Sequence, residues 1–204
     1  MDKHVIINIG RQFGSGGKTI ASCLGERLGI PVYDNELITK AAENSGLSAS
    51  VFSQSDERRG FLGLGSFLGS LRFWDSSRNV MNDGELFRIQ SEVIRDIAGK
   101  GSAIFVGRAS DYVLRDFETL DVFIFAPMEV RKQMVAERRG ISLEEAEALI
   151  IKKDKARKSY YDLYTLGDNW GVASNYDLCI DSSLLGPEAS AEHIISFGRQ
   201  AGRI

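Results

Sequence analysis

Cysteine is scarce in this sequence, and long hydrophobic runs are missing from it. The two cysteines, Cys23 and Cys179, lie far apart, which argues against a disulfide scaffold or a thiolate metal site. Isolated thiols are typical of a reducing compartment, so we expect a cytoplasmic protein. No apolar run approaches the roughly 20 residues that span a bilayer, and the first residues lack the apolar core of a signal peptide. We therefore expect no membrane association.

An excess of charge of one sign is also absent. Lys and Arg number 25 against 28 Asp and Glu, which gives a formal net charge of −3. So weak a field does not favour binding to a nucleic-acid polymer or to an anionic membrane. With 204 residues, 43% of them hydrophobic, the chain is long enough to bury a core. We expect a single domain over 1–204, interrupted by one insertion.

A glycine-rich segment near the N-terminus carries the strongest functional signal. It reads Gln12-Phe13-Gly14-Ser15-Gly16-Gly17-Lys18-Thr19 and lies between an apolar run and a helical pattern. The backbone N–H groups of such a turn, together with the positive end of the helix dipole, bind phosphate oxygens. The segment predicts a P-loop, in which Lys18 reaches the outer phosphates of ATP and Thr19 holds Mg²⁺. The residues expected to bind ATP are Gly14, Ser15, Gly16, Gly17, Lys18 and Thr19.

One position departs from the P-loop pattern. G-x-x-x-x-G-K-[ST] requires a glycine where this chain has Gln12. The alternative interpretation is a flexible Gly-Ser turn that merely joins a strand to a helix. The ordered succession of strand, glycines, Lys-Thr and helix favours phosphate binding over that alternative.

Strand-like apolar runs alternate with helical patterns along the rest of the chain. We expect strands at 4–9, 31–34, 103–106, 120–126 and 177–180. We expect helices at 18–28, 35–44, 85–98, 128–139, 143–161 and 188–199. Continuous apolar runs suit parallel strands that are covered on both faces. The alternation predicts a three-layer α/β fold of the P-loop NTPase type, with a central parallel sheet of about five strands.

The alternation breaks between about residues 45 and 84, where Gly, Ser and Phe are frequent, above all in 59–73. Such a composition does not suit a regular core element. The segment could be a flap over a substrate, an apolar surface through which the chain forms a homo-oligomer, or a long insertion without a defined structure. The sequence leaves these interpretations open.

Five segments, in order and spacing, resemble the cytidylate kinase-like family of P-loop nucleoside monophosphate kinases, over residues 4 to about 195. They are Arg11–Lys18, Gly29–Ile38, Val106–Tyr112, Asp154–Tyr161 and Tyr176–Ser182. The resemblance implies ATP- and Mg²⁺-dependent phosphoryl transfer to a small-molecule nucleotide, from CMP or dCMP to CDP or dCDP. In this branch the first P-loop glycine is often absent, which accounts for Gln12.

Acceptor-binding residues follow from the resemblance, and Arg108 has support of its own. It comes just after the strand at 103–106, and open α/β sheets bind ligands at the carboxyl ends of their strands. A surface arginine paired with an acid is the alternative. Asp34 would lie beside the acceptor's ribose and base, or would only cap the next helix. The further residues implied for the acceptor are Asn35, Lys40, Arg88, Asp111, Asp154 and Arg157.

A helix–turn–helix lid over about 131–165 is also implied by the resemblance. Such a lid closes over ATP, drives off water and delivers arginines to the transferring phosphoryl group. We expect Arg131, Arg139 and Arg157 to act with Lys18 in catalysis. Asp154 would orient Arg157 across an i,i+3 spacing. Solvated charge on an exposed helix face is the alternative for each of these residues.

The identity of the acceptor stays open at this stage. Ala109 stands where the better-known cytidylate kinases carry an Asp that helps to read cytosine. A P-loop kinase for another small acceptor, or a nucleotide-binding sensor without turnover, are the alternative functions. Aromatic residues near the end of the lid would stack on a base or simply pack; they are Tyr160, Tyr161, Tyr164 and Trp170.

Overall fold

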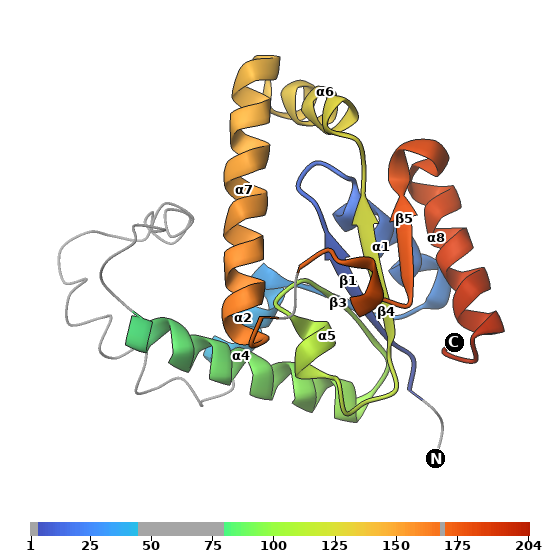
Figure 1. The fold of residues 1–204 in the computed structure, drawn as a ribbon. Helices are drawn as coiled ribbons and strands as arrows, with labels where there is room; N and C mark the ends of the chain where they lie inside the picture. Colours follow the sequence, from blue (N-terminus) through green and yellow to red (C-terminus); the bar gives the residue numbers. More distant parts are fainter. Residues whose placement is uncertain (1–3, 45–79, 168–169) are drawn as a thin grey trace.

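Five parallel strands form the central sheet of the protein in a computed structural model, which describes residues 4–44, 80–167 and 170–204 (Figure 1). The strands are β1 (Ile6–Arg11), β2 (Val32–Asp34), β3 (Ala103–Val106), β4 (Leu120–Phe125) and β5 (Leu178–Asp181). Their order across the sheet is β2-β3-β1-β4-β5. Because β1 pairs with β3 on one side and with β4 on the other, the residues that follow β1 emerge at the centre of the sheet.

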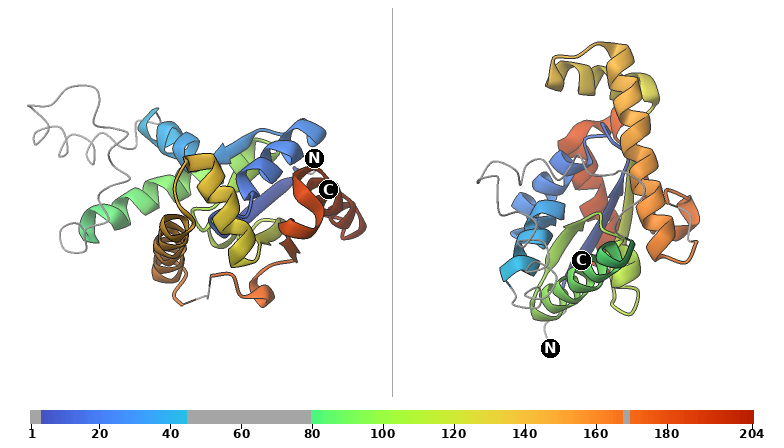
Figure 2. Two further views of the ribbon diagram at one scale, coloured as in Figure 1. Left: turned by 90° about the horizontal axis from the view of Figure 1, so that it is seen from above. Right: turned by 90° about the vertical axis from the view of Figure 1, so that its left-hand side faces the viewer.

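Helices cover both faces of this sheet (Figure 2). On one face, α1 (Gly17–Leu28) and α8 (Ser182–Gln200) lie against each other. On the other face lie α4 (Val80–Lys100) and the short α5 (Ser110–Val113), and α2 (Asn35–Asn44) packs on α4. Strand side chains alternate between the faces, so Ile7 and Ile9 pack with α1 and α8, whereas Ile6 packs with α4 and α5. Both faces of the sheet are apolar, as the continuous apolar runs of the sequence predict.

A pair of helices, α6 (Met128–Arg139) and α7 (Leu143–Tyr164), occupies the range predicted for the lid. Figure 1 shows α6 beyond the carboxyl end of β4, and α7 running from there past the sheet towards α4. The pair has a small core of its own, made by Val135, Ala136, Ala146 and Ile150. A left-handed Gly140 ends α6, and a capping box between Ser142 and Glu145 begins α7.

The predicted three-layer fold is confirmed, but some boundaries differ from the prediction. β1 runs on to Arg11 because its last residues pair with β4. α8 begins at Ser182 rather than at 188, since Asp181 caps a first turn that continues across a kink at Gly186. α4 begins at Val80, inside the range expected for the insertion. The sequence does not predict α5 or the 3-10 turn η2 (Ala173–Asn175), each of which is about one turn long.

The glycine- and phenylalanine-rich segment at 59–73 lies outside the described residues. Its predicted role as a flap or as a self-association surface therefore stays a prediction. Among the described helices, none combines the length and the apolar composition needed to cross a bilayer.

Candidate active site

The loop between β1 and α1 has a conformation that depends on its glycines. Gly14 and Gly16 adopt positive φ angles of 83° and 73°, a region that glycine enters without strain. A Cβ atom on Gly14 would lie 2.9 Å from Cγ2 of Val135 in α6. The lid therefore packs directly on the loop, and only glycine fits between them.

Gln12, which replaces the first glycine of the pattern, has a structural task. Its backbone N–H donates to the Ile124 carbonyl (3.0 Å), and its side-chain Oε1 accepts from the Ala126 N–H (3.3 Å). The start of the loop is thereby attached to the end of β4. The departure from the P-loop pattern at this position leaves the rest of the loop intact.

Two serines fix the middle of the loop. The Ser15 hydroxyl is buried and lies 3.0 Å from the Gln12 carbonyl and 3.2 Å from that of Ile124. Ser182, the first residue of α8, has its hydroxyl 2.7 Å from the Ser15 carbonyl and 3.1 Å from that of Phe125. The Ser15 side chain is therefore used inside the loop, and only its backbone is left for the predicted contact with ATP.

The first turn of α1 offers a site for an anion. Gly16 precedes the helix without any side-chain cap, and the first N–H groups of a helix have no partner within the helix. Lys18 and Thr19 are exposed on this turn. An uncapped helix N-terminus beside an exposed ammonium and hydroxyl is suited to bind a phosphate group, and Thr19, the predicted ligand for Mg²⁺, lies on the same turn.

Asp34, at the carboxyl end of β2, serves two partners at once. Its Oδ2 lies 2.7 Å from Nζ of Lys18, and its Oδ1 accepts from the N–H groups of Glu36 and Leu37, both at 3.1 Å. Burial would raise the pKa of Asp34, but the hydrogen bonds from Lys18 and from these two N–H groups outweigh it and hold the pKa below its usual value. Asp34 therefore caps α2 and also pairs with Lys18, whereas its predicted place beside the acceptor stays a prediction.

Arg108 projects from a strained turn at the carboxyl end of β3. Gly107, Arg108 and Ala109 have successive φ angles of 82°, 64° and 51°. Left-handed backbone at two non-glycine residues costs roughly 1–2 kcal/mol each and is typical of functional sites. Nε of Arg108 donates to Oδ1 of Asn35, and its guanidinium lies 5.0 Å from the centroid of the Tyr160 ring. Within the described ranges no acid lies at ion-pair distance from Arg108.

Aromatic rings from α4 and α7 gather near Arg108. Tyr164 stacks on Phe87 with centroids 4.0 Å apart, and Tyr160 contacts both rings edge-on. Trp170 instead lies edge-on to Phe123 of β4. Of the predicted aromatic residues, Tyr160 contacts Arg108 and Tyr161 contacts Asp111, so two of them touch a predicted acceptor residue.

Asp154 of α7 joins the lid to the loop. One oxygen accepts from the Phe13 N–H (2.7 Å), and the other pairs with the buried Arg131 of α6 (2.6 Å). Arg131 also donates to the carbonyls of Ala126 (3.0 Å) and Phe13 (3.2 Å). Arg131 therefore supports the loop, because its guanidinium is bonded to Asp154 and to two backbone carbonyls beside the loop.

The other two predicted lid arginines, Arg139 and Arg157, lie around the Phe13 ring together with Arg138, to which sequence reasoning assigns no role. The guanidinium carbons of Arg138, Arg139 and Arg157 lie 5.8, 5.7 and 5.4 Å from its centroid. Arg157 pairs with Asp154 (3.5 Å), as the i,i+3 spacing predicts, and donates to the Arg11 carbonyl (3.3 Å). Burial lowers the pKa of Arg157, Asp154 opposes this effect, and Arg131 adds to it. The lid thus brings positive charge to the edge of the loop.

Three residues predicted for the acceptor are not brought to Arg108. Arg88 is exposed and pairs along its own helix with Glu85 and Glu92, at i,i+3 and i,i+4 spacings that bring side chains together on one helix face. Lys40 is exposed on α2. Asp111 accepts from the Tyr161 hydroxyl (2.6 Å) in a separate pocket, where burial raises its pKa to about 6. Their roles in acceptor binding stay predictions.

Sequence reasoning assigns no role to Arg11, Phe13 or Ser182. Arg11 had a signal, because it directly follows a predicted strand and directly precedes the glycine-rich loop. Phe13 and Ser182 act through contacts with distant segments, and no local pattern marks them.

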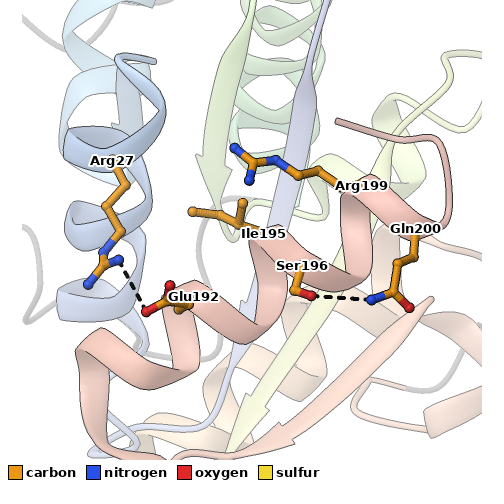
Figure 3. A pocket seen from close by; sticks show the side chains of 6 residues that line it. All are labelled: Arg27, Glu192, Ile195, Ser196, Arg199 and Gln200. Carbon is orange, nitrogen blue, oxygen red and sulfur yellow. Dashed lines mark hydrogen bonds and ion pairs between the residues drawn. The ribbon is translucent and has the colours of Figure 1, made fainter.

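A hollow of about 650 Å³ lies elsewhere, between α1 and α8 (Figure 3). Arg27 and Glu192 form an ion pair of 3.4 Å across it, and Ser196 and Gln200 share a hydrogen bond. Arg27 is at the end of α1 opposite to the loop, roughly 15 Å away for a helix of this length. None of its lining residues lies at the carboxyl end of a strand, so the loop between β1 and α1 stays the candidate active site.

Several known proteins are similar to this chain over most of its length. A model of the cytidylate kinase-like family matches residues 6–184. A cytidylate kinase from Methanopyrus kandleri is 32% identical over 190 residues, which cover 88% of this chain and 85% of that enzyme. A solved structure from Eubacterium ventriosum shares 27% identity, with a TM-score of 0.72, over 95% of this chain and 97% of that one.

A more distant structure shows the fold without a close relationship in sequence. Shikimate kinase from Bacteroides thetaiotaomicron is 14% identical, with a TM-score of 0.52, over 98% of this chain and 99% of that one. The resemblance inferred from the sequence is confirmed by the family match over nearly the whole chain. The chain therefore belongs to the cytidylate kinase-like family and is a P-loop phosphotransferase.

Proposed function

We propose that this enzyme transfers the γ-phosphoryl group of ATP to CMP or dCMP and releases CDP or dCDP. The observation that carries the proposal is the convergence, at one edge of the sheet, of an uncapped helix N-terminus bearing Lys18 and a strained turn bearing Arg108. In this proposal the helix N-terminus binds the triphosphate of ATP, and the turn offers the Arg108 guanidinium to a second phosphate, that of the acceptor. The named relatives support a nucleoside monophosphate as the molecule that carries this second phosphate.

On the donor side, the N–H groups of the glycine-rich loop and of the first turn of α1 hold the phosphates. ATP supplies the phosphoryl group, and Mg²⁺ neutralises the charge that develops on its oxygens. Thr19 would hold the metal, and Lys18 would leave Asp34 for the outer phosphates. The Lys18 side chain is 73% exposed and flexible, so it is free to move, and the move breaks its ion pair with Asp34.

On the acceptor side, Arg108 binds the monophosphate and Asn35 orients Arg108. Asp34 Oδ2, once Lys18 has left it, accepts a hydrogen bond from a ribose hydroxyl while Oδ1 continues to cap α2. No protein nucleophile is required, because an acceptor phosphate oxygen attacks the γ-phosphorus directly. Positioning and charge neutralisation then account for catalysis.

The lid contributes Arg139 and Arg157, which surround Phe13 beside the loop. Asp154 keeps Arg157 in place and ties the lid to the loop through the Phe13 N–H. We assign Arg131 to the support of this arrangement, since its side chain is buried and bonded to three oxygen atoms of the protein.

The proposal is tested by ADP release from Mg-ATP with a panel of nucleoside monophosphates. Lys18→Ala should abolish turnover, whereas Arg27→Ala, a change at the far end of the same helix, should leave it unchanged. Turnover with CMP or dCMP that is lost only in Lys18→Ala supports the proposal. Turnover with none of the monophosphates, in a protein that still binds ATP, refutes it.

A different small acceptor is the second candidate, and Ala109 is the observation that favours it. Ala109 is buried and left-handed, so it offers a methyl group where the better-known cytidylate kinases have an acid that reads cytosine. The same panel, extended to nucleosides and hydroxylated acids, would identify such an acceptor. Location in the cytoplasm and self-association through 59–73 stay predictions from the sequence.

A further inference from the structure

Arg11, the last residue of β1, lies at the centre of the site. Its aliphatic stem is covered by the start of α1: a Cβ atom on Gly17 would lie 2.8 Å from Cβ of Arg11 and 3.1 Å from its Cγ. Its guanidinium lies against Gly107, where a Cβ atom would overlap Nη1. Two glycines, one from the donor loop and one from the Arg108 turn, thus make the space in which this side chain lies.

The surroundings of the Arg11 guanidinium are cationic. Arg108 follows Gly107 directly, and Arg157 binds the Arg11 carbonyl. Asp34, the acid whose charge acts on Arg11, is paired with Lys18. Among the residues that the structure describes, no carboxylate lies within ion-pair distance of Arg11. Burial first, and then the charge of Arg157, lower its pKa to about 9; Asp34 opposes this shift and Arg108 adds to it.

Arg11 is half-buried, and a cation that is partly withdrawn from water without a counter-charge is unfavourable unless the site binds an anion. A guanidinium suits a phosphoryl group because it offers two parallel N–H donors. Arg11 also lies between the group that holds the donor and the group that we assign to the acceptor. These observations all indicate an anion at this point.

We propose that Arg11 is a catalytic residue that contacts the phosphoryl group in transit, between Lys18 and Arg108. In that step an acceptor phosphate oxygen forms a bond to the γ-phosphorus while the bond from the γ-phosphorus to the bridging oxygen of ADP breaks. Arg11 balances the charge on the oxygens of the moving group and exchanges no proton. The identity of the anion rests on the proposed function, whereas the anion site itself rests on the geometry.

The test combines binding with turnover. Affinity for inorganic tripolyphosphate is measured by calorimetry, and kcat and KM are measured with Mg-ATP and CMP. Arg11→Met keeps the stem that packs on Gly17 and removes the charge, and Arg27→Met is the matched control at the other end of α1. Loss of a charge-assisted hydrogen bond should weaken tripolyphosphate binding by about 10- to 100-fold in Arg11→Met. The same variant should lower kcat by a similar factor, and the control should change neither quantity.

The outcomes separate this proposal from the proposed function. If the wild type phosphorylates no monophosphate but Arg11→Met still loses tripolyphosphate affinity, the proposed function fails and the anion site stands. If the wild type phosphorylates CMP and Arg11→Met matches Arg27→Met in both readouts, the assignment of Arg11 is overturned. The assignment is also overturned if the wild type does not bind tripolyphosphate.

A second variant covers the case in which Arg11→Met does not fold. Arg11→Lys keeps the stem and the charge but loses the planar pair of donors, so we expect about fivefold weaker tripolyphosphate binding. Affinity equal to that of the wild type in Arg11→Lys would overturn the assignment of the guanidinium as the contact.

Discussion

Asp154→Ala should destabilise the protein strongly, because it removes the carboxylate that binds both the Arg131 guanidinium of the lid and the Phe13 N–H of the loop. The Arg131 and Asp154 side chains are only 7% and 16% exposed, and the same carboxylate accepts from the Phe13 N–H. Removing one member of a buried ion pair costs about 3–5 kcal/mol. The residual exposure of Asp154 favours the lower value, so we expect a loss of about 3 kcal/mol.

For a chain of this size, each kcal/mol lowers the Tm by roughly 2–4 °C, so the expected loss is about 6–12 °C. Thermal unfolding followed by circular dichroism measures it directly. The control is Asp96→Ala, which removes the exposed i,i+4 partner of Lys100 on α4 and should cost about 0.5 kcal/mol or less. A Tm loss in Asp154→Ala no larger than that in Asp96→Ala would refute the reasoning.

A double replacement separates charge from packing. Arg131→Met combined with Asp154→Leu removes both charges and leaves neither of them buried alone. It should be less destabilising than Asp154→Ala, since apolar replacement of a buried pair is often neutral. If the double variant instead loses the sum of the two single losses, the two side chains do not act as a pair.

Three further changes test other parts of the structure. Ser182→Ala removes the hydroxyl that binds the Ser15 carbonyl, so Mg-ATP affinity measured by calorimetry should fall about fivefold, and unchanged affinity would contradict a role in loop support. Gly25→Ala would place a Cβ atom 2.5 Å from a β2 side chain and should lower the free energy of unfolding, measured in urea, by about 1–3 kcal/mol. Gly99→Ala has open space around the new Cβ atom and should raise the same free energy by up to about 1 kcal/mol. Asp111→Asn should raise the Tm at pH 7 and lose this advantage near pH 4. Burial raises the pKa of Asp111 in the folded state from 3.8 to about 6, so the wild type loses stability as the pH rises between these values. A Tm advantage of the variant that does not depend on pH would contradict this reasoning.

The fold could be predicted because its signals are local. Each strand is a short apolar run, each helix repeats its apolar positions, and Gly16-Gly17-Lys18 joins the first strand to the first helix. Where local signals end, the prediction loses accuracy. The turn after β5 continues into α8 because Asp181 caps it, and that depends on hydrogen bonds rather than on periodicity.

The site was less predictable because its side chains are placed by contacts between distant segments. Phe13 and Asp154 are 141 positions apart in the chain and share one hydrogen bond. Arg131 is recognisable as a lid arginine, but only the structure reveals that its guanidinium is directed at backbone carbonyls of the loop. Arg11 is another example, since the space that it occupies is made by Gly17 and Gly107 together.

The hydrogen bond between Ser182 and Ser15 has a consequence for how the protein folds while it is being synthesised. Ser15 leaves the ribosome early, but its partner follows 167 positions later. The neighbours of β1 in the sheet, β3 and β4, are also synthesised long after it. Because such non-local contacts form only after the intervening chain exists, the nucleotide loop cannot reach its final shape on a nascent chain. The loop is thus translated among the first residues but is among the last parts to reach its folded conformation. A chain that terminates before α8 lacks Ser182 and cannot form this hydrogen bond.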